Sequence, residues 1–168
     1  HRKVSVTTGV NITDYIFQKA TQTQKKIFFL GASDESNAKA RTRFHSEFGQ
    51  VACGESPEKA DLLDHAYVDS LIRELKHRDI CYVILGFGAP HQEEFMLRHY
   101  ERLRSETNVE VMIGAGAVID FYSGAQKRCP SWINKIGLEI FYRFLTEISL
   151  KRANRIIESL QGLLWLRK

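Results

Sequence analysis

Three apolar runs, each containing or directly followed by a glycine, stand out along the chain. They are KIFFLGAS at residues 26–33, DICYVIL at residues 79–85 and VEVMI at residues 109–113. Uninterrupted apolar runs bounded by glycine are typical of parallel strands that are covered on both faces. The pattern therefore predicts three strands, the first of them buried on both faces, with a fourth, weaker strand at residues 50–54.

Apolar residues recur at helical spacing between these runs. After the run at 26–33, Ser33 or Asp34 can cap the next helix because both side chains accept hydrogen bonds from backbone N–H groups. The predicted helices cover a short stretch from residue 11, then residues 34–48, 60–77 and 91–105.

The alternation of strands and helices predicts an α/β fold. Right-handed crossovers of this length give a Rossmann-like, doubly wound and mostly parallel sheet. An alternating run at residues 4–7 could add an edge strand. Sequence typical of strands gives way near Pro130 to helical, aromatic and basic sequence. We therefore expect a core over residues 1–130 and a helical, basic C-terminal appendage over residues 131–168.

Composition and charge sharpen this division. The chain has 168 residues, 43% hydrophobic and 26% charged, which is typical of a globular protein. Its formal net charge is +4. Residues 141–168 hold six of the 24 Lys and Arg and two of the 20 Asp and Glu, so the whole excess lies there. A neutral core without a recognised module argues against nucleic-acid binding.

Cysteines and leader sequences indicate little further chemistry. Cys53, Cys81 and Cys129 lack the spacing of a zinc site or a disulfide framework, so we expect free thiols in a reducing compartment. No apolar run is long enough to span a membrane, and no secretory leader is visible. Because the first residue is His1 rather than Met, we expect the natural protein to have residues upstream.

The carboxyl ends of the predicted strands are the candidate ligand site. In open α/β sheets ligands bind outside these ends, where residues 31–33, 86–92 and 114–120 should converge. Their glycines would let the backbone approach a phosphate, or serve only a tight turn. The candidate binding residues in these loops are Gly31, Ala32, Ser33, Gly86, Gly88, Pro90, Gln92, Glu93, Gly114, Gly116 and Asp120.

Three polar side chains in these loops differ in how much they suggest. Glu93 would stand in the first turn of a helix, where the helix dipole favours an acid. The Gln92 amide can donate and accept together, as recognition of a sugar or a base edge requires. Asp120 follows an apolar run and is either a helix or turn cap, or a carboxylate facing the ligand.

The end of the chain has its own pattern. Residues 148–168 combine apolar positions with Lys and Arg and include Trp165. A basic amphipathic helix could lie on an anionic membrane surface, with the tryptophan at the level of the headgroups. It could equally pack on the domain or on another subunit.

Three segments, in fixed order and spacing, resemble the WecG/TagA/CpsF glycosyltransferases. They are GFGAPHQEEF at residues 86–95, GAGAVIDFYSGAQKRCPSW at 114–132 and GLEIFYRFLTE at 137–147. TGVNI at residues 8–12 is also similar to a motif of that family, with Asn11 in place of the usual Asp. Three ordered motifs are far more specific than a single glycine-rich loop.

The resemblance implies an inverting transfer of an N-acetylmannosamine-type sugar from UDP to a lipid-diphosphate-linked saccharide, without a cofactor or a required metal. The products would enter bacterial cell-surface polysaccharides such as teichoic acid, at the inner face of the plasma membrane. Gln92 matches the family's substrate-positioning glutamine. Arg143 is a candidate for neutralising the diphosphate, and further matches to the family's binding segments are Arg128, Trp132 and Glu139.

The family's proposed general base, an aspartate, is expected upstream of the TG motif and outside this chain. Its absence leaves a second hypothesis, a catalytically inactive module that binds nucleotide or assembles at a membrane. A homo-oligomer would cover apolar surface left without its N-terminal neighbour.

Overall fold

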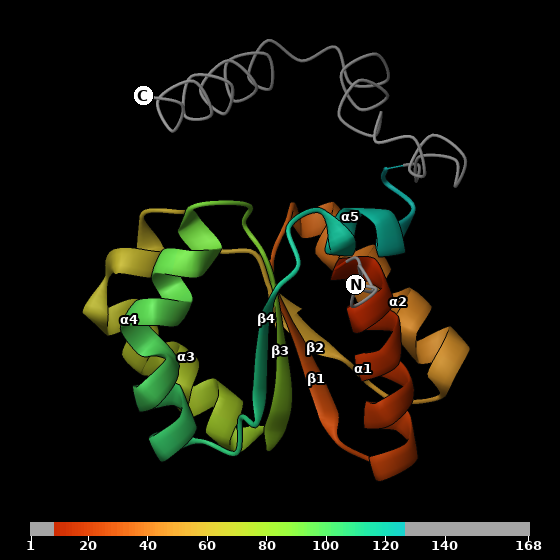
Figure 1. Ribbon diagram of the computed structural model, residues 1–168, viewed down its shortest axis with the longest axis horizontal. Helices are drawn as coiled ribbons and strands as arrows, with labels where there is room; N and C mark the ends of the chain where they lie inside the picture. Colours follow the sequence, from red (N-terminus) through yellow and green to blue (C-terminus); the bar gives the residue numbers. More distant parts are fainter. Residues whose placement is uncertain (1–8, 127–168) are drawn as a thin grey trace, which may run out of the picture. The chain divides into compact units, whose positions relative to one another are not determined.

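Four parallel strands form one sheet in the order β2-β1-β3-β4 in the computed structural model, which describes residues 9–126 (Figure 1). Chain order reverses between β1 and β3, as in a doubly wound fold. The predicted Rossmann-like α/β fold is confirmed. The strands are β1 (Lys26–Gly31), β2 (Cys53–Glu55), β3 (Ile80–Gly86) and β4 (Val111–Gly114).

Helices cover both faces of this sheet. Figure 1 shows α1, α2 and α5 on one face and α3 and α4 on the other. Each crossover between parallel strands thus carries its helix back along the sheet. The helices are α1 (Gly9–Thr23), α2 (Asp34–Phe48), α3 (His65–His77), α4 (His91–Glu106) and α5 (Val118–Ser123), with a 3-10 turn at Asp61–Leu63.

The alternation of side chains along β1 divides the core in two. Phe28 and Leu30 pack with α3 and α4, whereas Phe29 packs with the helices of the other face. There Phe17 of α1 meets Phe29 and Phe44 edge to face, with ring centroids 5.7 and 5.2 Å apart. Because both faces are buried, β1 and β3 read as continuous apolar runs.

Several boundaries differ from the predicted ones. The strand predicted at residues 50–54 begins only at Cys53, where pairing with Phe28 starts. The helix predicted at residues 60–77 is wrong over its first turn, because Asp64 caps α3 by accepting a hydrogen bond from the Ala66 N–H at 2.9 Å. The strand predicted at residues 109–113 lies two residues later.

Two of the predicted elements lie outside residues 9–126. The chain divides into two units, residues 1–126 and 127–168, and the described residues belong to the first. The edge strand at residues 4–7 and the helical appendage lie outside the described residues, so both stay predictions. Within residues 9–126, no helix is long and apolar enough to cross a membrane. Cys53 and Cys81 are free thiols.

A buried histidine adds a pH-dependent term to this fold. His99 of α4 is 9% exposed and lies beside the ring of Phe95, with centroids 5.0 Å apart. Within the described residues its Nε2 has no hydrogen-bond partner. Burial lowers the pKa of His99, and the nearby charges of His65, Arg98 and Arg102 lower it further, whereas a backbone hydrogen bond with Leu62 opposes the shift in part. The folded protein therefore favours the neutral imidazole.

We expect the free energy of unfolding to fall as the pH drops below about 6.5, because the unfolded chain binds the His99 proton more tightly. Each tenfold difference in proton affinity corresponds to about 1.4 kcal/mol. In His99→Gln this component should be absent. Urea unfolding of both proteins from about pH 7.5 to about pH 5 measures it. Parallel curves for the two proteins would show that His99 does not contribute.

Candidate functional site

The carboxyl ends of β1, β3 and β4 meet at one edge of the sheet, as predicted. The Ala32 N–H donates to the Gly86 carbonyl at 3.1 Å, which joins the first two loops. The Ala115 N–H donates to the Leu85 carbonyl at 2.9 Å, which joins the second and third. The edge therefore presents three short loops held to one another by backbone hydrogen bonds.

The first loop leaves β1 in an unusual backbone conformation. Gly31 and Ala32 have φ of 104° and 63°, in the left-handed region that favours glycine. A Cβ on Gly31 would also lie 3.0 Å from a ring carbon of Phe87. The Ser33 hydroxyl then caps α2 by accepting from the Ser36 N–H at 3.2 Å, as predicted. These residues form a close turn against the second loop.

The second loop runs from Gly86 to the start of α4. A Cβ on Gly86 would lie 2.7 Å from the side chain of Ile119, so the absence of a side chain there lets α5 approach β3. Gly88 has a φ of 73°, and Pro90 follows Ala89 through a cis peptide bond and precedes the first residue of α4. This geometry fits the predicted role of these glycines in tight turns, and their predicted approach to a phosphate stays a prediction.

Gln92 connects the second loop to the third. Its side chain is 6% exposed. The amide oxygen Oε1 accepts from the Gly116 N–H at 3.0 Å, and Nε2 donates to Glu93 at 2.8 Å. A Cβ on Gly114 would lie 3.0 Å from the same amide. The amide therefore holds two loops in position, and one N–H of Nε2 has no partner among the described residues.

The third loop leads into α5, a helix that the sequence did not predict. Gly116 has a φ of 56°, and the N-cap of α5 is Ala117. Asp120 is not the N-cap, because it stands inside the first turn of the helix, where it is half-buried. Its backbone carbonyl accepts from Ser123 Oγ at 2.8 Å and from the Gln126 N–H at 3.1 Å. Asp120 thus helps to end the short helix through its carbonyl.

One buried residue at this edge was missed from the sequence. Asn37 of α2 is 1% exposed, and its Nδ2 lies 3.0 Å from the carbonyl oxygens of Phe29, Gly31 and Glu55. It joins the ends of β1 and β2. A Cβ on Gly54 would lie 2.4 Å from the Phe29 oxygen and 2.7 Å from Asn37 Oδ1, so only glycine fits there. The one available signal was an amide on the apolar side of a helix.

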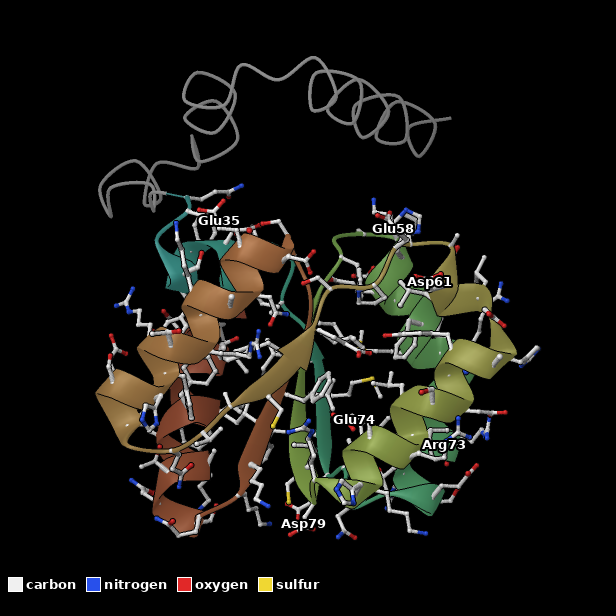
Figure 2. The ribbon with its side chains drawn as sticks, turned by 180° about the vertical axis from the view of Figure 1, so that it is seen from behind. Glu35, Glu58, Asp61, Arg73, Glu74 and Asp79 are labelled. Atoms are coloured by element: carbon white, nitrogen blue, oxygen red, sulfur yellow. The ribbon has the colours of Figure 1, made fainter. Side chains whose placement is uncertain are left out.

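Carboxylates surround this end of the sheet. Glu35, Glu58 and Asp61 lie near the end where the strands finish, whereas Asp79 lies at the opposite end (Figure 2). None of the predicted site residues within 9–126 is Lys or Arg. In the same part of the chain, no cluster of three or more His, Cys, Asp or Glu could hold a metal ion. The predicted site residues within 9–126 therefore include no side chain that would neutralise a diphosphate.

The cationic candidates lie outside the described residues. These candidates are Arg128 and Arg143, with the basic stretch at residues 148–168. The predicted binding residues Trp132 and Glu139 belong to the same second unit of the chain. The predicted roles of all these residues are untested.

An open parallel sheet with a switch point between β1 and β3, and small-residue loops at its carboxyl edge, defines a Rossmann-like α/β protein with its candidate ligand site there. The chain belongs to the WecG/TagA/CpsF family of glycosyl transferases, whose model matches residues 1–166. The membership predicted from the three motifs is confirmed.

Curated relatives carry a more specific name. The N-acetylglucosaminyldiphosphoundecaprenol N-acetyl-beta-D-mannosaminyltransferase of Staphylococcus aureus strain MRSA252 is 30% identical over 148 residues, covering 88% of this chain and 54% of that protein. The protein of the same name from strain NCTC 8325 is 28% identical with the same coverage. The chain thus spans about half the length of the curated relatives it matches.

The hydrogen bond between Gln92 and Gly116 gives a first test of the site. In Gln92→Ala the Gly116 N–H loses its acceptor, so we expect a loss of about 1 kcal/mol or more in local stability. Amide hydrogen exchange at Gly116, followed by NMR, should become about tenfold faster for each 1.4 kcal/mol lost. Glu94→Ala, an exposed neighbour in the same helix turn, is the control and should leave this exchange unchanged. Equal exchange in both variants would contradict a bridging role.

Proposed function

We propose that the protein containing this chain transfers an N-acetylhexosamine, of the N-acetylmannosamine type, from a UDP donor to a lipid-diphosphate-linked saccharide in bacterial cell-surface polysaccharide synthesis. The observation that carries the proposal is that two family motifs, at residues 86–95 and 114–132, begin in adjacent loops bridged by Gln92. The names of the relatives support the choice of sugar and acceptor.

The reaction is a displacement at the anomeric carbon of the donor sugar. The oxygen of an acceptor hydroxyl forms a bond to this carbon while the bond to the UDP oxygen breaks, which inverts the configuration. The bonding electrons leave with UDP, and the acceptor proton passes to a general base. The resemblance assigns this base to an aspartate upstream of residue 1. The chain would then supply the donor side of the site.

Negative charge develops on the diphosphate as UDP leaves. Preorganised cations and N–H donors stabilise such charge most effectively. Because the described edge carries carboxylates, we assign the neutralisation to Arg128 and Arg143 of the second unit, with no metal required. In this proposal Gln92 serves the reaction by fixing the two loops and by offering its unused N–H to the substrate.

The acceptor lipid requires contact with a membrane. Residues 148–168 provide cations and apolar side chains that could hold the protein on an anionic surface at the inner face of the plasma membrane. Peripheral attachment of this kind would hold the protein at the membrane that carries the acceptor.

The full-length protein should release UDP from UDP-N-acetylmannosamine when a lipid-diphosphate-linked N-acetylglucosamine is present, also with EDTA. Gln92→Ala should lower kcat by roughly 100-fold, the order found when one positioned polar group is removed. Coupled measurement of UDP release gives both results. UDP binding without any sugar transfer, for every UDP-N-acetylhexosamine tried, would instead favour the inactive nucleotide-binding module.

Membrane attachment is tested separately by liposome flotation. We expect the chain to float with vesicles containing anionic phosphatidylglycerol and to remain unbound with neutral phosphatidylcholine. Removing residues 148–168 should abolish flotation, and high salt should weaken it because the attraction is screened. Flotation that is independent of this segment would remove its assigned role.

A further inference from the structure

Glu55 stands at the carboxyl end of the strand next to β1. It is the last residue of β2 and pairs with Leu30, one residue before the Gly31 turn. The two strands lie about 4.8 Å apart, which is well within the length of one nucleotide. A ligand bound at the switch point between β1 and β3 could therefore extend over β1 to Glu55.

Buried polar groups hold Glu55 in register with the first loop. Asn37 Nδ2 lies 3.0 Å from the carbonyl oxygens of both Gly31 and Glu55. Ser56 Oγ donates to the Gly31 carbonyl at 3.2 Å. The position of Glu55 relative to the loop is thus fixed by hydrogen bonds on both sides of its backbone.

Glu55 is half-buried, and among the described residues only one of its two carboxylate oxygens has a hydrogen-bond partner. The Tyr67 hydroxyl donates to Oε1. Burial, followed by the hydrogen bond to Glu55, raises the pKa of Tyr67 far above its ordinary range, so this hydroxyl keeps its proton. None of the ion pairs within residues 9–126 includes Glu55. A half-buried carboxylate without a cation is costly unless another donor satisfies it.

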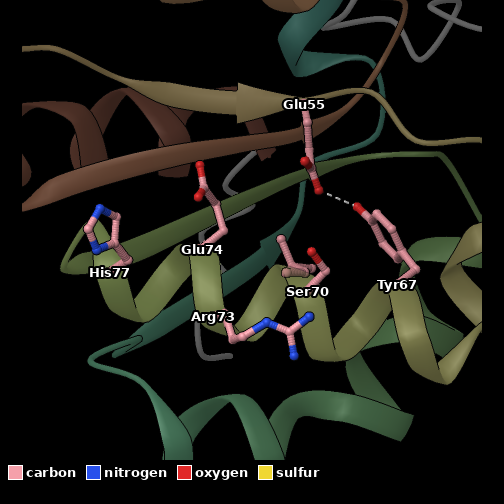
Figure 3. Close-up of a pocket in the computed structure, with 7 residues that line it drawn as sticks. Glu55, Tyr67, Ser70, Arg73, Glu74 and His77 are labelled. Carbon is pink, nitrogen blue, oxygen red and sulfur yellow. Dashed lines mark hydrogen bonds between the residues drawn. The ribbon is translucent and has the colours of Figure 1, made fainter.

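The same carboxylate opens onto a hollow beside α3. Figure 3 shows Glu55 reaching from the end of β2 toward Tyr67, and the hollow continues along α3 past Ser70 and Arg73 to Glu74 and His77. The hollow has a volume of about 430 Å³, within the range of small-molecule sites. There is thus room for a ligand hydroxyl at the free carboxylate oxygen.

We propose that Glu55 contacts the donor nucleotide and accepts a hydrogen bond from the 2′-hydroxyl of its ribose. A carboxylate recognises ribose in this way at the end of the second strand of many Rossmann folds, about 20 residues after the first glycine turn. Here Glu55 follows Gly31 by 24 residues. The sequence motifs gave no sign of this contact. The inference rests on the proposed function in that it takes UDP as the donor.

The test compares two ligands on two proteins. Isothermal titration calorimetry with the full-length protein should show UDP binding about 10 to 100 times more tightly than 2′-deoxy-UDP, because a hydrogen bond to a charged acceptor is lost. In Glu55→Ala the two ligands should bind within about threefold of each other. The ratio of the two affinities for one protein is unaffected by any general effect of removing a negative charge near the diphosphate, because that effect changes both affinities equally.

Two controls keep the outcomes distinct. Glu58→Ala removes an exposed acid three residues away and should retain the wild-type ratio. Tyr67→Phe keeps the carboxylate but removes its partner, so the ratio should persist. If wild type binds UDP but Glu55→Ala keeps the discrimination, or if 2′-deoxy-UDP binds wild type equally well, the ribose contact is wrong and UDP recognition stands. If UDP itself does not bind, the proposed function and the ribose contact both fail.

Discussion

Two buried carboxamides hold the carboxyl edge of the sheet together. Where parallel strands end, the backbone groups beyond the last pair lose their ladder partners and must find others. Asn37 meets this need between β1 and β2, and Gln92 meets it between the loops after β3 and β4. Both side chains are nearly inaccessible to water. A polar group buried in this way destabilises the fold if its hydrogen bond is not made, because water cannot replace the partner. The shape of the candidate site depends on these two amides.

The acidic and basic residues of the proposed site belong to different units of the chain. Residues 1–140 carry no net charge, and the edge described within 9–126 has carboxylates near its loops. The basic residues of the proposed site belong to the region after Lys127. The neutralisation proposed for the diphosphate therefore rests on residues outside the part of the chain that the structure describes.

The strands were predictable because β1 and β3 are buried on both faces and read as unbroken apolar runs. The cap at Ser33 was predictable for a similarly local reason. The start of α3 was not, since Asp64 is one of several acids in that stretch and its capping role depends on where the chain turns. Helix α5 was missed because its apolar residues continue the pattern of the preceding strand.

The candidate site was predicted only in part. The convergence of the three loops could be predicted from the sequence, because the carboxyl ends of parallel strands lie at the same edge of a sheet. The use of Gln92 as a bridge depends on the distance between two loops that are far apart in the sequence. Asn37 and Glu55 depend in the same way on pairing between β1 and β2, to which no local pattern points.

The fold restricts position 54 to glycine. A side chain there would collide with the Phe29 carbonyl, which is part of the sheet, as well as with Asn37. Replacing Asn37 by a smaller residue removes one collision and leaves the other. A change at position 37 therefore does not make room for a side chain at position 54. Position 54 is confined to glycine by the backbone of the neighbouring strand, whichever residue occupies position 37.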